Sequence, residues 1–528
     1  MNNPMAQRIE LIDASIEELE QLVDCAGQGP LPPEGQRKLK AAVATLGIMA
    51  GMLADKDITI RKLRELLTPT RTTEKTKKVL DSAGAEEPER KPASRRKGHG
   101  RNGPGSYPGA RKVSVPHPSM KRADHCPGCM KGKVYPLSEP RSLIRIIGQA
   151  PVEATVYELE ALRCNLCGEV FTAPPPAGVG TEKYDASAVG MIALLKYGSG
   201  IPFYRMQKLE SALGIPLAPA TQWQLVSEAA TILEPVEEEL IRQAAQGSLM
   251  HNDDTSMRIL NFEREPGDSR TGLFTSGIVS VTAGRRIATF FTGSRHAGEN
   301  LADVLQRRAK QLAPPIQMCD ALSRNAPAAF LVMLANCLAH ARRHFVDVVS
   351  SFPSECRYVL ETLREVFHFD VLAKEQGLTP QERLIFHQQN SLPLMDGLHQ
   401  WCKQQFEERK VEPNSGLGKA IQYLQNHWQA LTLFLREPGA PLDNNVCERA
   451  LKKAILHRKN ALFYRTINGA HAGDLFMSLI HTAELGGVNP FDYLTELLRH
   501  PRELAQSPRD WMPWNYRENL AQATDLAA

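Results

Sequence analysis

Residues 249–320 carry the pattern that most limits how this chain can fold. Three runs rich in β-branched and apolar residues are typical of strands, and the turn residues Thr282-Ala-Gly separate the last two as in a hairpin. A segment with the period of an amphipathic helix follows, and then a short apolar run typical of a buried strand. The three strands, the helix and the last strand are predicted at 249–257, 272–281, 285–293, 297–312 and 315–320. This order predicts an α/β fold.

Two of the predicted strands carry acidic side chains near their ends. Asp253 lies in the first strand, and Asp320 ends the fourth. Successive side chains of a strand point to opposite faces, so Asp254 faces away from Asp253. We therefore prefer Asp253 as the functional residue, with Asp254 as the competing candidate. The order of strands and helix matches a ribonuclease-H-like fold, in which the first and fourth strands carry aspartates at neighbouring positions.

A third acid, Glu448, lies in the string Leu442-Asp-Asn-Asn-Val-Cys-Glu-Arg-Ala-Leu-Lys452, where a turn precedes a segment of helical character. Two aspartates on strands and a glutamate on a later helix form a ligand set for hard divalent cations such as Mg²⁺ or Mn²⁺. Two such ions about 3.5–4 Å apart stabilise the attacking and leaving oxygens of a phosphodiester. The chain has 59 acidic residues, so the three acids by themselves are weak support for phosphoryl transfer.

Four cysteines form two Cys-x-x-Cys pairs, which flank a segment with strand-like runs at 143–147 and 152–159. Each pair presents two thiolates on a tight turn, and four thiolates complete a tetrahedral structural Zn²⁺ site. Redox-active dithiols and coincidence are the alternatives. The predicted zinc ligands are Cys126, Cys129, Cys164 and Cys167. A closed site of this kind is structural, so we assign it no catalytic role.

The acidic strings, in this order, resemble the bacterial transposases of the insertion-sequence 66 family. The family pattern reads His-x-Asp-Glu-Thr, then a hydrophobic run ending in Asp, then Asp-Asn-Asn-x-x-Glu-Arg. This chain has His251-Asn-Asp-Asp-Thr255, Asp320 and Asp443-Asn-Asn-Val-Cys-Glu-Arg449. The likeness continues in Gly98-His-Gly-Arg-Asn-Gly103, His457-Arg-Lys-Asn-Ala-Leu-Phe463, Ser478-Leu-Ile-His-Thr-Ala483 and Asn489-Pro-Phe-Asp-Tyr-Leu494.

Three positions depart from the family pattern. Asp254 stands where the family usually has Glu, and Ala461 replaces a usual Trp. After Asp320 the chain reads Ala-Leu-Ser-Arg-Asn instead of Gly-Tyr-x-x-Tyr. These departures indicate a divergent branch of the family and not an inactive enzyme, because the three acids are intact.

The resemblance implies a Mg²⁺-dependent DNA transposase that binds terminal inverted repeats, cleaves at the ends of the element and transfers the strands. Asp253 and Asp320 would hold the metals jointly, and Glu448 would bind the second one. The implied partners are double-stranded DNA (terminal repeats and target), further copies of the chain in a homo-oligomer, and small accessory proteins of the same element. Two alternatives remain open, namely a DNA-binding relic or regulator and a metal-dependent nuclease without strand transfer.

The N-terminal part predicts a helix and a basic linker. Apolar residues recur every seventh position from Leu39 to Leu67, which indicates a short coiled coil or a helix packed on its own domain. Residues 90–112 hold eight Lys or Arg and no acid, interleaved with Gly, Pro and Ser. We interpret them as a flexible arm that contacts DNA phosphates. The DNA-binding candidates of the arm are Arg95, Arg96, Lys97 and Arg101.

Other segments suggest further contacts with DNA. Runs at 202–213 and 219–230, separated by a short turn, are typical of a helix-turn-helix. The second helix would offer Thr221, Gln222 and Gln224 to a groove of DNA. An ordinary helical hairpin is the alternative. The remaining DNA-binding candidates are Arg342, Arg343, Arg449 and Lys452. The neighbouring Cys337 and His340 would make half a zinc site, but no second pair is evident, so we favour packing or DNA contact for this string.

The length of 528 residues favours several domains. No apolar run approaches the roughly 20 residues that span a bilayer, and the N-terminus lacks the apolar core of a signal peptide. We therefore expect no membrane partner and a bacterial cytoplasmic, nucleoid-associated protein. The predicted segments are a helical region (1–68), a basic linker (69–112), a zinc module (113–173), a helical DNA-binding candidate (174–247), the core (248–345 and 439–486), a helical insertion (346–438) and a C-terminal tail (487–528).

Overall fold

The computed structural model describes residues 112–129, 131–135, 150–163, 169–180, 182–264 and 270–527, together with a few isolated positions. The chain divides into two units, Met1–Lys78 and Val79–Ala528, and the elements below belong to the second. The predicted heptad helix and Cys164 lie outside the described residues, as do the DNA-binding candidates Arg95, Arg96, Lys97 and Arg101 of the basic arm. Within the described part, no helix is long and apolar enough to cross a membrane.

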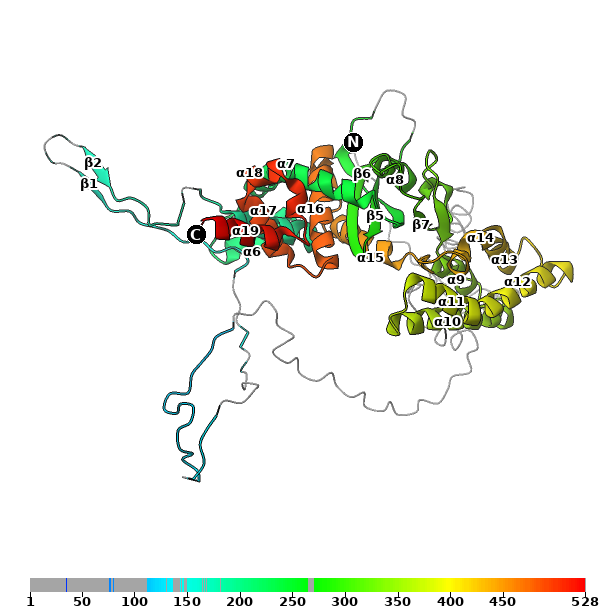
Figure 1. Ribbon diagram of the computed structural model, residues 1–528. Coiled ribbons are helices and arrows are strands. Elements are labelled where there is room, and N and C mark those ends of the chain that lie inside the picture. Colours follow the sequence, from blue (N-terminus) through cyan, green and yellow to red (C-terminus); the bar gives the residue numbers. More distant parts are fainter. Residues whose placement is uncertain are drawn as a thin grey trace. The chain divides into compact units, whose positions relative to one another are not determined.

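A five-stranded mixed sheet forms the centre of the fold (Figure 1), in the order β6-β5-β3-β7-β8. β3 pairs antiparallel with β5 and parallel with β7, so it lies in the middle of the sheet. β5 and β6 form an antiparallel hairpin, and β7 and β8 are parallel. The bounds are β3 Leu249–Ser256, β5 Phe274–Thr282, β6 Arg285–Gly293, β7 Ile316–Cys319 and β8 Met333–Asn336. The sheet thus joins three antiparallel strands to two parallel ones.

The hairpin turn has a simple local cause. Ala283 and Gly284 form the two-residue loop, and both have positive φ, at 48° and 79°. This is the backbone of a type I′ turn, which matches the twist of the strands and favours Gly. The ends of the three predicted antiparallel strands agree with β3, β5 and β6 to within two residues. β8, which has only four residues, was not predicted.

Helices cover both faces of the sheet (Figure 1). α8 (Ala297–Leu305) packs on β3 and β5 from one face, where Leu301 shares an apolar cluster with Ile278 of β5. α15 (Asn445–Ala461) packs on the same two strands from the other face. A Cβ atom added to Gly277 of β5 would lie 3.0 Å from Cδ2 of Leu451, so the glycine permits this close approach. α8 is shorter than the predicted helix 297–312.

α16 (Ile467–Leu485) packs against β6, the edge strand of the sheet. Three polar side chains spaced four residues apart bond to the backbone of β6. Thr482 Oγ1 accepts from Ala288 N at 3.0 Å, Ser478 Oγ accepts from Phe290 N at 3.0 Å, and Asp474 Oδ2 accepts from Thr292 N at 2.6 Å. The helix thereby satisfies edge-strand groups that would otherwise be open to pairing with another strand.

The segment between β8 and α15 consists of helices with an apolar core of their own, including Phe345, Leu363 and Leu398. Its elements are α9 Leu338–Val346, α10 Pro353–Glu375, α11 Pro380–Asn390, α12 Leu392–Glu407, α13 Gly416–Asn426, α14 Trp428–Leu431 and η4 Leu433–Leu435. Ile316 and Met318 of β7 belong to the same core, so the helices rest on the β7–β8 side of the sheet.

Helices from both ends of the described chain share another core, which contains Ile192, Leu233, Phe476 and Tyr493. They are α5 Ala186–Ala193, η2 Leu194–Gly198, α6 Phe203–Ala212, α7 Pro219–Ala244, α17 Pro490–Arg499, α18 Pro501–Gln506, η5 Pro508–Trp511 and α19 Tyr516–Ala527. The segment 487–528, expected as a C-terminal tail, contributes Tyr493 and Trp511 to this core.

Two expectations about smaller elements are wrong. The run 152–159 forms no strand, and the described hairpin consists instead of β1 (Ala161–Arg163) and β2 (Val170–Thr172). Gln222 of α7 is fully buried, and its Nε2 donates to the carbonyls of Leu217 at 2.9 Å and Phe203 at 3.2 Å. Its amide holds α6 against α7, so it cannot reach into a DNA groove. A short parallel pair, β4 (Ile259–Asn261) and β9 (Tyr464–Thr466), completes the described strands.

Candidate metal centre

The parallel register of β3 and β7 relates Asp253 to Asp320. Leu249 pairs with Ile316, and His251 pairs with Met318. Continuing this register by two residues sets Asp320, which directly follows β7, opposite Asp253 within β3. The two acids, which are separated in sequence by the β5–β6 hairpin and α8, thus lie on neighbouring strands at matching positions.

Asp253 faces α15, and its neighbour Asp254 faces α8. Asp253 pairs across the sheet with Gly277, over which Cys447 and Leu451 of α15 pack. Asp254 pairs with Ser276, whose hydroxyl accepts from Asn300 Nδ2 of α8 at 2.8 Å. The alternation expected for a strand therefore separates the two carboxylates.

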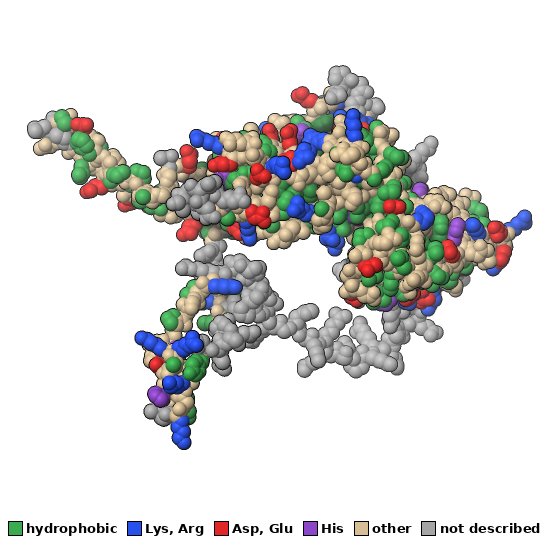
Figure 2. Space-filling model, in the orientation of Figure 1, with side chains coloured by type: hydrophobic (Ala, Val, Ile, Leu, Met, Phe, Trp, Pro, Cys, Tyr) green, Lys and Arg blue, Asp and Glu red, His purple; other side chains and the backbone are tan. Residues whose placement is uncertain are grey.

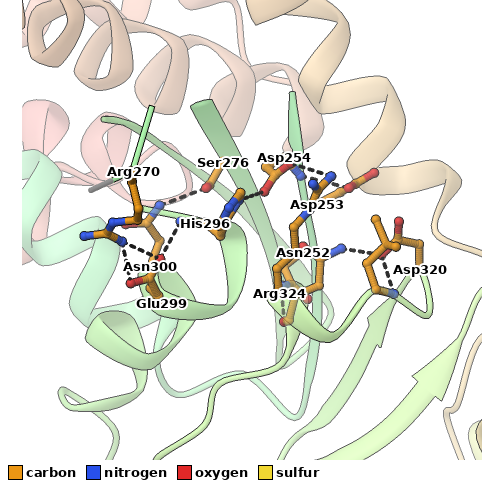
Figure 3. A network of polar contacts seen from close by, with 12 residues as sticks. Asn252, Asp253, Asp254, Arg270, Ser276, His296, Glu299, Asn300, Asp320 and Arg324 are labelled. Atoms are coloured by element: carbon orange, nitrogen blue, oxygen red, sulfur yellow. Dashed lines mark hydrogen bonds and ion pairs between the residues drawn. The ribbon is translucent and has the colours of Figure 1, made fainter. Parts of the chain in front are cut away.

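Asp254 is held in a network of polar contacts on the α8 side (Figure 3). Its Oδ2 lies 2.8 Å from His296 Nδ1, and its Oδ1 lies 3.3 Å from an Arg324 guanidinium nitrogen. The Asp254 side chain is only 2% exposed. Both oxygens of Asp254 thus have polar partners on the α8 side of the sheet.

Asp320 is oriented by the loop that follows β7. Asn325 Nδ2 donates to Asp320 Oδ1, and the backbone N–H of Leu322 donates to the same oxygen at 3.2 Å. Asn325 is fully buried, and its backbone carbonyl accepts from Asn252 Nδ2 at 2.8 Å and from Gln317 Nε2 at 2.6 Å. Asn325 stands where the resembled family has its second Tyr. Asn325 therefore links Asp320, through its side chain, to β3 and β7, through its backbone carbonyl.

Glu448 lies in the first turn of α15, and Asn444 fixes where that helix begins. The Asn444 side chain contacts two residues of β3, with Oδ1 3.0 Å from His251 Nδ1 and Nδ2 donating to the Asn252 carbonyl at 3.1 Å. The Asn444 backbone N–H donates to Cys337 Sγ at 3.3 Å. Asn444 thus joins α15 to β3 and to the start of α9. Sequence reasoning treated this residue only as part of a turn, because its partners are remote in the chain.

The three acids also influence one another electrostatically. The pKa of Asp253 is raised from 3.8 to about 7, first by burial and then by the negative charges of Asp320, Asp254 and Glu448, against the opposing effect of the backbone N–H of Asp254. Like charges that share a partly buried site disfavour ionisation of one another. A divalent cation would reverse this effect, because carboxylate oxygens are the ligands that hard cations prefer. The donor set therefore fits Mg²⁺ or Mn²⁺.

Two other residues approach Glu448 from α9. Ligand atoms of Cys337, His340 and Glu448 all lie within 4.8 Å of one another. His340 Nε2 is 3.8 Å from Glu448 Oε1. The Cys-x-x-His string was visible in the sequence, but its proximity to Glu448 was not, since 107 residues lie between His340 and Glu448.

The DNA-binding candidates differ in how accessible they are. Arg343, Arg449 and Lys452 are exposed, whereas Arg342 is partly buried. Lys453, which follows Lys452 in α15, forms an ion pair with Glu484, with Nζ 2.9 Å from Oε1. On the face of the described part seen in Figure 2, Lys and Arg side chains are interspersed with Asp and Glu. Individual side chains, and not a continuous positive stripe on that face, are therefore the candidates for phosphate contact.

The first cysteine pair lies on a tight turn. Cys126 N donates to the Gly132 carbonyl at 2.8 Å, and Gly132 N lies 3.4 Å from Cys129 Sγ. Hydrogen bonds from the backbone of Gly132 and Lys131, and from the Cys126 thiol, lower the pKa of Cys129. Such a turn favours a thiolate, which is the form that binds metals. Cys167 is exposed, and Cys164 lies outside the described residues, so the four-thiolate zinc site remains a prediction.

Comparison with known proteins identifies the family. A family model described as "Transposase IS66 family" matches residues 182–472, which is more than half of the chain. This chain belongs to the IS66 family of transposases. The match includes Asp253, Asp320 and Glu448 together with the helices between them. The departures at 254 and 325 are therefore variations within the IS66 family, and both residues have buried polar partners here.

Curated relatives extend the likeness beyond the matched region. The uncharacterized protein y4jD of Sinorhizobium fredii (strain NBRC 101917 / NGR234) is 27% identical over 421 residues, which cover 75% of this chain and 79% of that protein. The uncharacterized protein y4hP of the same strain is 25% identical over 400 residues, covering 70% and 69%. Both are similar in sequence to this IS66-family chain over most of their length.

Proposed function

We propose that this chain is a Mg²⁺-dependent DNA transposase and that Asp253, Asp320 and Glu448 hold its metal ions. The observation that carries the proposal is the parallel register of β3 and β7, which sets Asp320 opposite Asp253. Glu448 lies near enough for its charge to raise the pKa of Asp253 as well. Bound there, Mg²⁺ or Mn²⁺ would stabilise the charge on the phosphodiester oxygens during cleavage and strand transfer. Family membership supports the same activity.

The fold we propose for the catalytic part is ribonuclease-H-like. Its support is the order of three antiparallel strands, a helix and a parallel strand beside the first, with aspartates on the first strand and at the end of the fourth. In this interpretation α15 brings Glu448 to the two aspartates, and the helices between β8 and α15 form an insertion. The chain's own residues then act by positioning, because Asn444 orients Glu448 and Asn325 orients Asp320.

The proposed substrates are the terminal repeats of the element and target DNA. Arg449 and Lys452 are exposed on the helix that carries Glu448, so they are suited to contact phosphates beside the carboxylates. Such contacts position DNA without reading its sequence. The zinc module and the basic arm are proposed to add structure and sequence-independent affinity, respectively.

The test is a cleavage and joining assay on a labelled duplex that carries the end of the element. The full-length protein should cut this duplex in Mg²⁺ and join the cut end to a second duplex. Asp253→Asn, Asp320→Asn and Glu448→Gln should each abolish both steps, whereas Asp443→Asn, on the turn before α15, should retain them. Cutting without joining would favour the nuclease alternative. Full activity in all three neutralised variants would refute the proposed site.

A further inference from the structure

We propose that Cys337, His340 and Glu448 form a second, zinc-selective cation site that shares Glu448 with the carboxylate cluster. The three ligand atoms lie within 4.8 Å of one another. Cys337 precedes α9 and His340 lies in its first turn, while Glu448 comes from the first turn of α15. Three donors of different chemical types thus converge from two helices.

The separation of His340 and Glu448 is close to that of two ligands of a tetrahedral ion. His340 Nε2 and Glu448 Oε1 are 3.8 Å apart. Zinc bonds of about 2.0–2.2 Å to nitrogen and oxygen imply roughly 3.4 Å between these ligands in a tetrahedral site. Small rotations of the two side chains would close this difference. Three protein ligands leave the fourth position to water, as in zinc sites that remain open.

The backbone around the site is already fixed. Cys337 is fully buried, and its Sγ accepts a hydrogen bond from Asn444 N at 3.3 Å. Leu338 N donates to the Leu442 carbonyl at 2.9 Å, so the starts of α9 and α15 are held together directly. His340 Nδ1 is buried and has no hydrogen-bond partner among the described residues. The other ring nitrogen, Nε2, is the one that approaches Glu448 Oε1 at 3.8 Å.

The donor types select the metal. A thiolate and an imidazole favour Zn²⁺ over Mg²⁺, which prefers oxygen ligands. On binding, the Cys337 thiol would release its proton to solvent and form an S–Zn bond without any change of oxidation state. Because Glu448 would then be a zinc ligand, it would be withdrawn from the Mg²⁺ site. This last consequence, competition between the two ions, rests on the proposed function, whereas zinc binding itself does not.

Cobalt spectroscopy tests the site without DNA. Co²⁺ replaces Zn²⁺ in tetrahedral sites and gives visible bands and a near-ultraviolet thiolate charge-transfer band. The metal-free full-length chain should show these bands when Co²⁺ is added. In Cys337→Ser, the thiolate band should be weaker by the intensity that one bound Co²⁺ contributes. The matched control is Cys447→Ser, which removes a thiol that is equally buried beside Glu448 but donates to the Gly277 carbonyl at 3.2 Å. This control should keep the full spectrum.

A second variant guards against misfolding of the buried Cys337 substitution. The His340 side chain is 23% exposed, so His340→Gln should fold normally by circular dichroism and weaken Co²⁺ binding at this site at least about tenfold. Equal spectra for the wild type, Cys337→Ser and His340→Gln would overturn the zinc site. Loss of the band in Cys447→Ser with retention in Cys337→Ser would also overturn it. Neither result would bear on DNA cleavage, which is measured separately.

Discussion

Asn444 Oδ1 lies 3.0 Å from His251 Nδ1, although 193 residues separate the two in the chain. Burial lowers the pKa of His251 to about 4, and the hydrogen bond with Asn444 opposes that shift only in part. The ring is therefore neutral at pH 7, and its Nδ1–H donates to the amide oxygen. The contact fixes the start of α15 over β3, and with it the position of Glu448.

Replacing Asn444 with Ala should damage both stability and activity. The change leaves His251 Nδ1 and the Asn252 carbonyl buried without these partners, which costs on the order of 2 kcal/mol of unfolding free energy. Cleavage should fall further than stability alone accounts for, because Glu448 is no longer held in place. Chemical denaturation and the cleavage assay measure the two effects. Asn445→Ala, at an exposed neighbouring position, is the control and should leave unfolding within about 0.5 kcal/mol of the wild type.

Gly277→Val should displace α15 from the sheet. Even a Cβ atom at this position would lie 3.0 Å from Leu451 Cδ2 and 3.6 Å from Cys447 Sγ. The larger side chain should cost about 1–3 kcal/mol and reduce cleavage by moving Glu448 relative to Asp253. Gly293→Val is the matched control on β6, where nothing lies within 4 Å of an added Cβ. Equal cleavage by the two valine variants would show that the approach of α15 at Gly277 is unimportant.

Asp253→Asn should stabilise the metal-free protein. The pKa of Asp253 is raised from its usual 3.8 to about 7, so its ionised form is disfavoured in the folded state. At 1.36 kcal/mol per pKa unit, this opposes folding by on the order of 4 kcal/mol at pH 8. We therefore expect a higher Tm in EDTA at pH 8 for this variant, but not for Asp443→Asn. An unchanged or lower Tm for Asp253→Asn would argue against a folded state in which the ionised form of Asp253 is disfavoured.

Asp474 should make stability depend on pH. Burial raises its pKa from 3.8 to about 7, although hydrogen bonds from Thr292 lower it, and the nearby Glu237 is raised to about 8 mainly by burial. A raised pKa means that the folded state retains a proton which the unfolded state releases. The contribution of Asp474 is thus fully present below about pH 4 and is lost as pH rises through 7.

Unfolding of the wild type and Asp474→Asn should be compared between pH 5.5 and 8.5. The variant keeps an oxygen that can accept from Thr292 N, so it should fold. Its stability relative to the wild type should increase as pH rises towards about 7 and then level off. Parallel pH profiles would mean that Asp474 does not titrate in this range.

Local patterns allowed part of the fold to be predicted from the sequence. β3, β5 and β6 have strand-forming residues, and the Ala283–Gly284 turn has an unambiguous signature. β8 was missed because its residues, Met333-Leu-Ala-Asn336, include no β-branched or aromatic side chain that would favour a strand. The C-terminal helices were missed because Tyr493 and Trp511 are buried by partners remote in sequence. Gln222 was misread because polarity favours exposure, whereas its amide satisfies two buried carbonyls.

In the candidate site, too, residues with a local sequence signal could be predicted, and residues defined by remote contacts could not. The order of strings around Asp253, Asp320 and Glu448 was enough to select these acids, and strand alternation was enough to prefer Asp253 over Asp254. The residues that orient them could not be selected. Asn325 and Asn444 act through hydrogen bonds to other strands and helices, and His340 approaches Glu448 only after the intervening helices have folded.

The central claim is that Asp253 binds the ion that supports DNA cleavage, and the most direct test is a change of metal preference. Asp253→Cys replaces a hard oxygen ligand with a sulfur ligand, which Mn²⁺ tolerates better than Mg²⁺. Cleavage of a labelled duplex carrying the element's end should be measured in each metal. We predict that the variant is inactive in Mg²⁺ and regains activity in Mn²⁺. Wild-type cleavage by Asp253→Cys in Mg²⁺ would contradict the claim.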